Sequence, residues 1–516
     1  MTTTHAEVMQ PARNFHDHIR HTRFGQAQHH SGGATYRVGK HEVEPARHAR
    51  PEDQATLTTG EHVMHDTSKS EQAVEVHDPD MLAQARAVLN ACQSGQAMQE
   101  AVLAAVKRNE HWRGEQCINL LAPEAPTSLA VRALLAAEVG IRAAEGHIGT
   151  VNRWFAGTRY IDEIEALCVE LLKRVFRARY ADHRLVASML GNLTAYTALT
   201  DPGDVIMSIA QPFGGHSSNR SDGPAGVRGL KIVDVPMDPT ELVVDLDVFR
   251  KTAPLVRPKL VALGASLTLF PFPLQEMSAI VADWGGKLFF DGAHQIGLIA
   301  GGQFQDPLRE GAAVMTGSAG KTFSGPQSGI IVWDDPSLTP ALTHAIFPVL
   351  AATHQVNRVA ALAVAAAEML EFGPPYMTQI VRNAQALGAA LAQRGIPVFG
   401  AQQGYTRTHQ VLADVRAFGG GLDVAQMLAR ANIITNKNLL PSDTPRDWDR
   451  PSGLRLGTIE VTRLGMREQD MDLIADFMAR VVVEKLSPTT VVKDVIAFRQ
   501  GYQTLYYNFD HALPPP

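Results

Sequence analysis

Apolar residues follow two different spacings along the chain, and each spacing predicts a different kind of element. Short apolar runs are typical of buried strands, whereas apolar residues at three- and four-residue spacing are typical of amphipathic helices. In the middle of the chain the two patterns alternate, which predicts an α/β fold with a largely parallel sheet between helices. We expect strands at Val205–Ala210, Leu230–Val235, Lys259–Leu263, Lys287–Phe290, Ala313–Thr316 and Gly329–Trp333, and helices at Ile161–Phe176, Met189–Leu199, Leu246–Thr252 and Leu274–Trp284.

The same patterns divide the chain into five predicted parts. Residues 1–76 hold half of the 20 histidines and few large apolar residues, so we expect a disordered tail. Helical spacing at Met81–Cys92 and Met98–Trp112 predicts a helical arm over 77–150, before a large α/β domain over 151–356. The alanine-rich helix Val359–Phe372 opens a smaller α+β domain over 357–485, and a tail follows over 486–516.

Composition excludes several classes of partner. The chain has 516 residues, 45% hydrophobic and 19% charged, with a net charge of -6, which gives no reason to expect nucleic acid or an anionic membrane. We find no apolar run of membrane-spanning length, and the three cysteines form no CxxC pair. The absence of a disulfide framework is typical of a reducing compartment, so we expect a cytoplasmic location. No histidine spacing resembles a metal site, so we expect no metal.

Two residues at predicted strand ends indicate cofactor chemistry. Asp291 directly follows the apolar run Lys287–Phe290, and Lys321 stands 30 residues later in a stretch of small residues. A lysine amine can form a Schiff base with an aldehyde, and a carboxylate can keep a pyridine nitrogen protonated. On their own, the two residues are equally consistent with a turn after a strand and a surface lysine.

Several short motifs occur together in a specific order between Asn119 and Met466. In that order the chain resembles the serine hydroxymethyltransferase family of fold-type-I enzymes, which depend on pyridoxal 5'-phosphate (PLP). The resemblance implies an aspartate aminotransferase-like fold, in which a seven-stranded, mostly parallel large domain binds PLP. The motifs are Ala144-Glu145-Gly146, Pro202-Gly203-Asp204, Gly214-Gly215-His216, Pro258-Lys259-Leu260, Asp291–Ala300, Gly320–Pro326 and Ser452–Thr458.

The resemblance assigns cofactor contacts to five residues. Lys321 would hold PLP as a Schiff base, and Asp291 would pair with the pyridine nitrogen. His216 would stack on the face of the ring. Ser266 and His294 would lie near its phenolic oxygen.

The resemblance also implies the substrate contacts. Arg455 would bind the carboxylate of the amino acid, a task suited to a bidentate guanidinium. Glu145 would be the acid/base at the substrate hydroxyl, contributed across the interface of a homodimer with shared active sites. Phe155 stands where the family carries a tyrosine.

The phosphate site departs from the family pattern. Family members use a Ser-Gly-Ser turn at a helix N-terminus, where free N–H groups attract phosphate. Here Ser188 and the amides of Met189 and Leu190 are the candidates. Ala352-Thr353-His354 stands near the place of a Gly-Gly pair that would reach across from the second subunit.

Departures near the expected folate pocket bear on the reaction. PLP enzymes of this group make or break the Cα–Cβ bond of β-hydroxy amino acids, and true hydroxymethyltransferases also bind tetrahydrofolate. Polar residues at positions of the apolar folate walls should weaken binding of a flat ligand. We therefore predict a folate-independent aldolase or transaldolase that acts on a small amino acid and an aldehyde. The changed positions are Gln211, Ser217, Ser442, Gly320, Pro123, Gln327 and Ser328.

Three alternatives remain open at the level of sequence. The chain could be an authentic hydroxymethyltransferase that uses tetrahydrofolate. It could catalyse another PLP reaction, namely transamination, decarboxylation or β-elimination. It could also be a non-catalytic PLP-binding scaffold. The chain argues against this, because it keeps Glu145, Asp291, Lys321 and Arg455.

Overall fold

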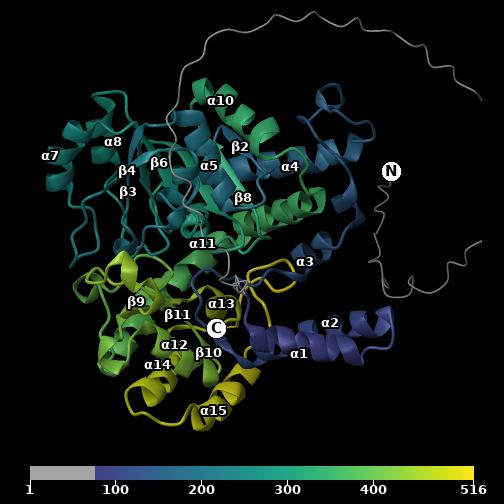
Figure 1. Ribbon diagram of the computed structural model, residues 1–516, viewed down its shortest axis with the longest axis vertical. Helices are drawn as coiled ribbons and strands as arrows, with labels where there is room; N and C mark the ends of the chain where they lie inside the picture. The colour runs from purple at the N-terminus through teal and green to yellow at the C-terminus, as the bar shows by residue number, and fades with distance from the viewer. Residues whose placement is uncertain (1–75, 516) are drawn as a thin grey trace, which may run out of the picture. The chain divides into compact units, whose positions relative to one another are not determined.

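A seven-stranded sheet forms the framework of the large α/β part of the computed structural model, which describes residues 76–515 (Figure 1). The strand order is β2-β8-β7-β6-β5-β3-β4, and only β8 runs antiparallel to its neighbours. The predicted α/β fold with a seven-stranded, mostly parallel sheet is therefore confirmed. The strands are β2 (Tyr180–Asp182), β3 (Val205–Ser208), β4 (Lys231–Asp234), β5 (Leu260–Leu263), β6 (Lys287–Asp291), β7 (Ala312–Ser318) and β8 (Gly329–Trp333).

Alternate residues of each strand enter the cores on the two faces of this sheet. Phe290 and Val261 pack in one core, whereas their neighbours Phe289 and Leu260 pack in the other. This period of two is what a sheet buried on both faces requires. The first face is covered by α4 (Arg159–Phe176), α7 (Leu246–Val256), α8 (Leu274–Ala282), α9 (Ile296–Ala300) and α11 (Val356–Gln393), and the second by α5 (Ser188–Leu199), α6 (Pro224–Val227) and α10 (Thr339–His344).

A second, smaller sheet supports the C-terminal part of the site. Its strand order is β11-β12-β9, all antiparallel, and the short β1 pairs in parallel with β10. Together these strands and the surrounding helices enclose a separate hydrophobic core. The elements are β1 (Ile118–Asn119), β9 (Gln410–Asp414), β10 (Ile433–Ile434), β11 (Asn436–Asn438), β12 (Gly453–Gly457), α12 (Gly421–Arg430), α13 (Ile459–Arg463), α14 (Glu468–Val482) and α15 (Pro488–Gln500).

The helix α11 is longer than the sequence pattern predicts. It runs for 38 residues and continues through Pro374 and Pro375, beyond the predicted end at Phe372. A proline inside a helix costs about 3 kcal/mol because its N–H is missing and its ring clashes with the preceding turn. Burial of the helix before and after the two prolines offsets this cost. Leu362 packs in the core of the large sheet, and Leu387 packs in the core of the small one.

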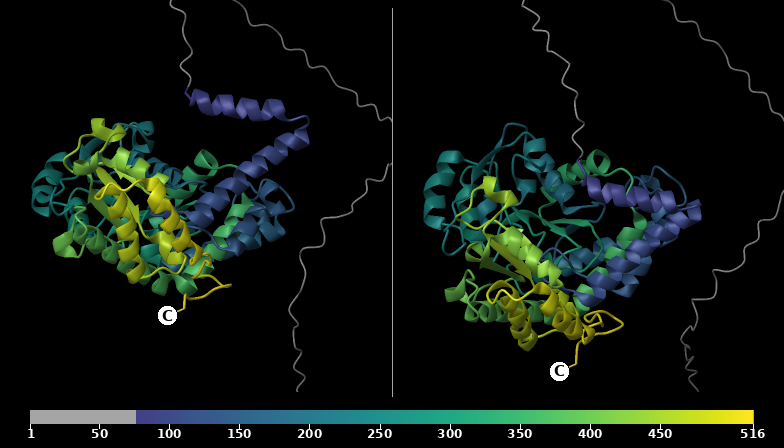
Figure 2. Two further views of the ribbon diagram at one scale, coloured as in Figure 1. Left: turned by 90° about the horizontal axis from the view of Figure 1, so that it is seen from below. Right: turned by 60° about the horizontal axis from the view of Figure 1, so that its bottom comes forward.

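The first helices of the described chain bury none of their side chains. Figure 2 shows α1 (Pro79–Ala91) and α2 (Gly95–Asn109) in purple, ahead of a wider π-helical segment and α3 (Leu129–Leu135). Apolar side chains on them, such as Leu89, Val102 and Leu103, are exposed. None of the described helices combines the length and the apolar character needed to cross a bilayer. The predicted tail over 1–76 lies, except for its last residue, outside the described residues.

Candidate active site

Four predicted site residues follow the carboxyl ends of neighbouring parallel strands. Asp291 is the last residue of β6, and Lys321 comes three residues after β7. Ser266 follows β5, and His216 follows β3. Because parallel strands end at the same edge of the sheet, this is where an open α/β fold gathers ligand-binding groups.

The carboxylate of Asp291 is buried and held by three hydrogen bonds. Its Oδ2 accepts from Nδ2 of Asn192 at 2.7 Å and from Nδ2 of Asn219 at 3.1 Å, and its Oδ1 accepts from the amide of Ala293 at 3.1 Å. Only 3% of Asp291 is exposed. Hydrogen bonds of this kind fix the orientation of the carboxylate.

Asn192 and Asn219 are functional residues that the sequence reasoning missed. The amide oxygen of Asn192 accepts from the hydroxyl of Thr316 at 2.7 Å, and that of Asn219 accepts from the hydroxyl of Tyr196 at 2.7 Å. Each amide group is therefore oriented with its nitrogen toward Asp291. The available signal was spacing, because Asn192 lies four residues after Ser188 on one helix and Asn219 lies three after His216.

Two glycines let backbone segments pass close to one another beside Asp291 and in the neighbouring loops. Gly264 has φ +99, and a Cβ there would lie 2.0 Å from the carbonyl oxygen of Asp291. Gly214 has φ +89, and a Cβ there would lie 2.4 Å from the carbonyl oxygen of Leu267. Other residues would be strained at these angles, so Gly214 allows the loops after β3 and β5 to meet and Gly264 allows the end of β5 to pass close to the end of β6.

Lys321 lies in a tight turn after β7. Its amide donates to the carbonyl of Ser318 at 3.3 Å, and its carbonyl accepts from the amide of Ser324 at 2.9 Å. Burial lowers the pKa of Lys321 to about 8, the negative charge of Asp291 opposes this, and the positive charge of Arg455 adds to it. The lysine therefore lies close enough to sense both charged groups, and its amine can be neutral near physiological pH.

His216 is oriented by its own loop. Its Nδ1 accepts from the amide of Ser218 at 3.1 Å and lies 2.8 Å from the hydroxyl of the same residue. Burial lowers the pKa of His216, and the positive charges of Lys321 and Arg455 also lower it, although Asp291 acts in the opposite direction. The ring is therefore neutral at pH 7, which suits a stacking role.

His294 is buried behind the same site. Its ring stacks on that of His409, with 5.6 Å between centroids and 12° between planes. Burial holds the pKa of His294 well below its ordinary value, and the charges of Lys321 and Arg455 lower it further. Its Nδ1 lies 3.4 Å from Nε2 of Gln410, which also donates to the carbonyl of Ser266 at 2.6 Å.

Arg455 is a buried cation on β12. Its Nη1 donates to the carbonyl of Ser266 at 2.6 Å and its Nε to Oδ1 of Asn436 at 3.2 Å, while only 8% of the residue is exposed. Burial lowers the pKa of Arg455 to about 10. Within residues 76–515 no carboxylate forms an ion pair with it. A buried guanidinium without a carboxylate is well suited to bind an anionic ligand.

A pocket of about 570 Å³ lies next to three of the residues described above. His216, Ser266 and Arg455 form part of its wall, so three predicted site residues face one space. The volume is that of a small-molecule site. The other lining residues are Gln211, Gly214, Gly215, Ser217, Asp222, Asn436, Asn438, Leu439, Pro445 and Trp448.

The predicted phosphate site lies at the N-terminus of α5. Ser188 is the first residue of this 12-residue helix, and its N-cap Ala187 has no side chain that could accept from the first amides. An uncapped N-terminus presents free N–H groups and the positive end of the helix dipole, which favours phosphate. Met189, the second candidate, is 43% exposed, so its contribution would come from its backbone. The amide of Leu190, the third candidate, already donates to the carbonyl of Ala187 at 3.1 Å.

The family model for serine hydroxymethyltransferase matches residues 96–478 of the chain. The chain belongs to the serine hydroxymethyltransferase family. The serine hydroxymethyltransferase of Methanocella arvoryzae is 46% identical over 391 residues, which cover 76% of this chain and 92% of that protein. That of Methanocaldococcus jannaschii is 43% identical over 409 residues, covering 78% and 94%. The resemblance inferred from the motifs is confirmed.

A solved structure shares the fold of this family member. The L-threonine transaldolase from Pseudomonas fluorescens matches with a TM-score of 0.74 and 28% sequence identity, over 80% of this chain and 94% of that one. Proteins similar to this chain are therefore named for two different activities. The choice between those activities depends on the details of the pocket.

Glu145 and Phe155, which the family resemblance assigned to the substrate site, lie apart from Lys321 in the described chain. Oε1 of Glu145 accepts a hydrogen bond of 2.5 Å from the hydroxyl of Thr353, and its carbonyl accepts from the amide of Trp154 at 3.0 Å. Phe155 is 45% exposed. Among the described residues, neither side chain has a hydrogen bond or ring contact with Lys321, Asp291 or Arg455. The roles of Glu145 and Phe155 therefore stay predictions.

Proposed function

We propose that this family member is a PLP-dependent enzyme that acts on the Cα–Cβ bond of β-hydroxy-α-amino acids such as serine and threonine. The main supporting observation is that Asp291 and Lys321 stand at neighbouring strand ends, while Arg455 donates to the carbonyl of Ser266, which follows the next strand, at 2.6 Å. The lysine can react with an aldehyde, and the arginine can bind a carboxylate. An amino acid bound to PLP needs both.

The residues present fit PLP. An ionised carboxylate has about four acceptor positions, and Asp291 uses three, so one remains for a protonated ring nitrogen. Lys321 would hold the aldehyde carbon, His216 the ring face, and Ser266 and His294 the side with the phenolic oxygen. When bound, PLP supplies a ring that accepts electron density from Cα of the amino acid. The α5 amides described above would bind its phosphate.

The chain's own residues would orient the substrate and move protons. Arg455 would bind the α-carboxylate in a bidentate manner, which fixes the rotation about Cα and so selects the bond that breaks. Lys321, with a pKa of about 8, can take up or release a proton at Nζ near neutral pH. Glu145 would accept the proton of the substrate hydroxyl as the Cα–Cβ bond breaks.

We further propose that the reaction is a folate-independent aldol cleavage or transfer. In threonine cleavage, the Cα–Cβ bond breaks and acetaldehyde leaves with the hydroxyl oxygen as its carbonyl. Cα then either takes a proton, which gives glycine, or bonds to the carbonyl carbon of a second aldehyde. The similarity to a threonine transaldolase supports the second outcome.

Two pairs of changed positions support independence from folate. Gln211 and Ser217, which stand where the family resemblance implies leucines, both line the 570 Å³ pocket. Gly320 and Gln327 contact each other, because a Cβ at 320 would lie 2.7 Å from Cδ of Gln327. A larger residue before the lysine would therefore displace Gln327, so these two departures belong to one rearrangement of the site.

The second candidate is a hydroxymethyltransferase that uses tetrahydrofolate. It is favoured by the names of the relatives that are 46% and 43% identical to this chain. In that case serine cleavage would accelerate when tetrahydrofolate is added. Polar Gln211 and Ser217 on the pocket wall are the features that argue against it.

The test measures acetaldehyde release from threonine with a panel of aliphatic and aromatic aldehydes, and serine cleavage with and without tetrahydrofolate. The proposal predicts acetaldehyde release, accelerated by acceptor aldehydes, and serine cleavage that does not depend on folate. Folate-dependent serine cleavage with inert threonine would establish the second candidate instead. Ketoacid, amine or pyruvate as the main product would refute both candidates. No product from an intact PLP-loaded protein would indicate a scaffold.

We also propose a homodimer in which Glu145 serves the site of the partner. Two inactive variants, Lys321→Ala and Glu145→Gln, provide the test. Dissociated, mixed and reassociated, they should form hybrid dimers with one intact site and regain up to about a quarter of the wild-type activity. If Glu145 acts within its own chain, the mixture stays inactive.

A further inference from the structure

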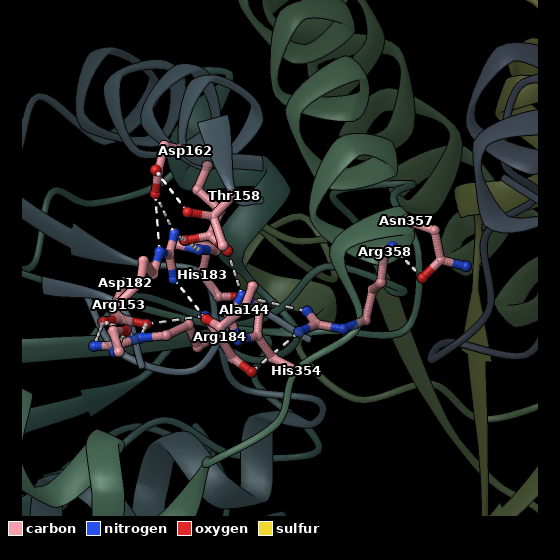
Figure 3. Close-up of polar contacts among 12 residues, drawn as sticks. Ala144, Arg153, Thr158, Asp162, Asp182, His183, Arg184, His354, Asn357 and Arg358 are labelled. Atoms are coloured by element: carbon pink, nitrogen blue, oxygen red, sulfur yellow. Dashed lines mark hydrogen bonds and ion pairs between the residues drawn. The ribbon is translucent and has the colours of Figure 1, made fainter. Parts of the chain in front are cut away.

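A buried cluster of metal-ligand side chains lies away from the active site. Glu165 comes from α4. His183 follows β2 and His354 precedes α11, and both are labelled in Figure 3. One ligand atom from each lies within 4.8 Å of the other two, and the residues are 1%, 3% and 2% exposed. Because these positions are far apart in the sequence, no spacing pattern could have indicated the cluster, and the sequence predicted no metal.

The two imidazoles are poorly satisfied by protein groups. Neither ring nitrogen of His183 has a hydrogen-bond partner in the described chain, including Nε2 on the side of Glu165, and Nδ1 of His354 has none either. Nε2 of His183 lies 3.5 Å from Oε2 of Glu165, which is too long for a strong hydrogen bond. Buried polar atoms without partners cost about 1–3 kcal/mol each, so each one needs a physical explanation such as an ion or water.

We propose that Glu165, His183 and His354 form a site for a divalent transition-metal ion of the zinc class. The set of two imidazoles and one carboxylate is a common zinc ligand set that leaves the fourth position open. In a tetrahedral site two ligand atoms lie roughly 3.3 Å apart. Nε2 of His354 lies 2.5 Å from Oε1 of Glu165, a distance that would have to lengthen by about 1 Å on binding.

Neighbouring groups hold the ligands in place. Nη2 of Arg153 donates to Oε2 of Glu165 at 2.6 Å, which leaves Oε1 as the oxygen to face the ion. Nη1 of Arg358 donates to the carbonyl of His183 at 3.2 Å and so anchors the backbone of that ligand. Hydrogen bonds to the far side of a ligand are a regular feature of metal sites.

The charges around the cluster nearly cancel, and the types of ligand limit the kind of ion. Arg153 contacts Asp162 as well as Glu165, Arg184 pairs with Asp182 at 2.6 Å, and Arg358 adds a further buried cation. The surroundings are thus nearly neutral. Hard ions such as Ca²⁺ and Mg²⁺ require several oxygen ligands, which this cluster does not offer. Imidazole ligands instead favour ions such as Zn²⁺ and Co²⁺.

An open face provides room for a fourth ligand. Glu165 and His183 line a pocket of about 370 Å³ together with Gly146, His147 and Arg184. A water molecule or a small anion could reach the ion from this side. An open coordination position of this type distinguishes the proposed site from a closed structural one.

The cluster is physically connected to the segment that carries Glu145. Nη1 of Arg153 donates to the carbonyl of Ala144 at 2.6 Å, and Thr353, the neighbour of His354, donates to Glu145. An ion bound to Glu165 and His354 would therefore stiffen the two loops that position this glutamate. The metal site itself does not depend on the proposed function.

The test compares the zinc content of three full-length proteins after equilibration with Zn²⁺ in a chelating buffer and desalting. They are wild type, His183→Ala and His147→Ala, which removes an exposed histidine from the same pocket. Residues 1–76 hold half of the 20 histidines, but any zinc bound there is common to all three proteins. We expect His147→Ala to match wild type and His183→Ala to lose one equivalent per chain. Equal zinc content in all three proteins would overturn the proposal.

A spectrum of the cobalt-substituted protein keeps the proposal testable if His183→Ala does not fold. Wild type loaded with Co²⁺ should show the intense visible bands of four-coordinate cobalt, and Glu165→Gln should lose them. Weak bands of six-coordinate cobalt alone in wild type would contradict the proposed site. Far-UV circular dichroism and cofactor absorbance check that each variant is folded.

Discussion

Arg455→Met should reduce activity and, at the same time, leave the protein as stable as before or more stable. Burial lowers the pKa of Arg455 from 12.5 to about 10. At 1.36 kcal/mol for each pKa unit, this corresponds to a burial cost on the order of 3 kcal/mol, which the substitution removes. The carbonyl of Ser266 keeps its bond from Gln410, and half-buried Asn436 can reach water, so little is left unpaired.

The loss of activity follows from the missing partner of the substrate carboxylate. Removing one partner of a buried, hydrogen-bonded charge pair costs about 2–5 kcal/mol, so kcat/KM for threonine should fall by about 30-fold or more. The assay combines initial rates with urea unfolding of the PLP-loaded enzyme without substrate. We expect the unfolding free energy to stay constant or to rise by up to about 3 kcal/mol.

A second buried arginine provides the matched control. Arg463 is 2% exposed, but its Nη2 lies 3.0 Å from Oε2 of the equally buried Glu368. Arg463→Met should therefore destabilise the protein by about 3–5 kcal/mol, because it leaves a buried carboxylate unpaired. If Arg455→Met destabilises the protein as much as Arg463→Met does, or lowers kcat/KM by less than tenfold, our interpretation of Arg455 as a carboxylate site is wrong.

Three further variants test other parts of the site. Asp291→Asn should lower kcat by about 100-fold or more, measured as acetaldehyde release, because its oxygen can still accept from Asn192 and Asn219 but the neutral amide cannot keep a pyridine nitrogen protonated; an active variant would contradict the role of the carboxylate. Thr353→Val should lower kcat roughly tenfold with little change in KM, because Glu145 loses its hydrogen bond, and unchanged kinetics would show that this contact is dispensable. In the cofactor-free protein, the pKa of Lys321 is about 8 when folded and near 10.5 when unfolded, so the unfolded state binds more protons between these values and stability should rise with pH across that window. Urea midpoints at several pH values should show this rise in wild type and not in Lys321→Met, and the same slope in both proteins would refute the assignment.

The sequence predicted the residues whose role depends on their position after a strand. Asp291 and Lys321 each follow an apolar run, and parallel strands bring their carboxyl ends to one edge, so local pattern and fold class predicted where they lie; their roles were implied by the family resemblance and stay predictions. The antiparallel direction of β8 could not be predicted, because a buried apolar strand reads the same in either direction. The three-residue β2 is too short to show a period.

Residues that depend on tertiary packing were missed. Asn192 and Asn219 contact Asp291 only because α5 and the loop after β3 pack on the same strand end. The metal-ligand cluster is another example, since Glu165 and His354 lie 2.5 Å apart but 189 positions apart in the chain. Side-chain pairs of this kind are set by how elements pack, which apolar periodicity does not describe.

The most direct test of the proposed function identifies the lysine that is covalently linked to PLP. The PLP-loaded protein is reduced with borohydride, digested and analysed by mass spectrometry, with Lys321→Ala as the control. We predict a pyridoxyl group on Lys321 in the wild type and no labelled peptide in the variant. A label on another lysine, or an unlabelled Lys321 in protein that has PLP bound, would contradict the account.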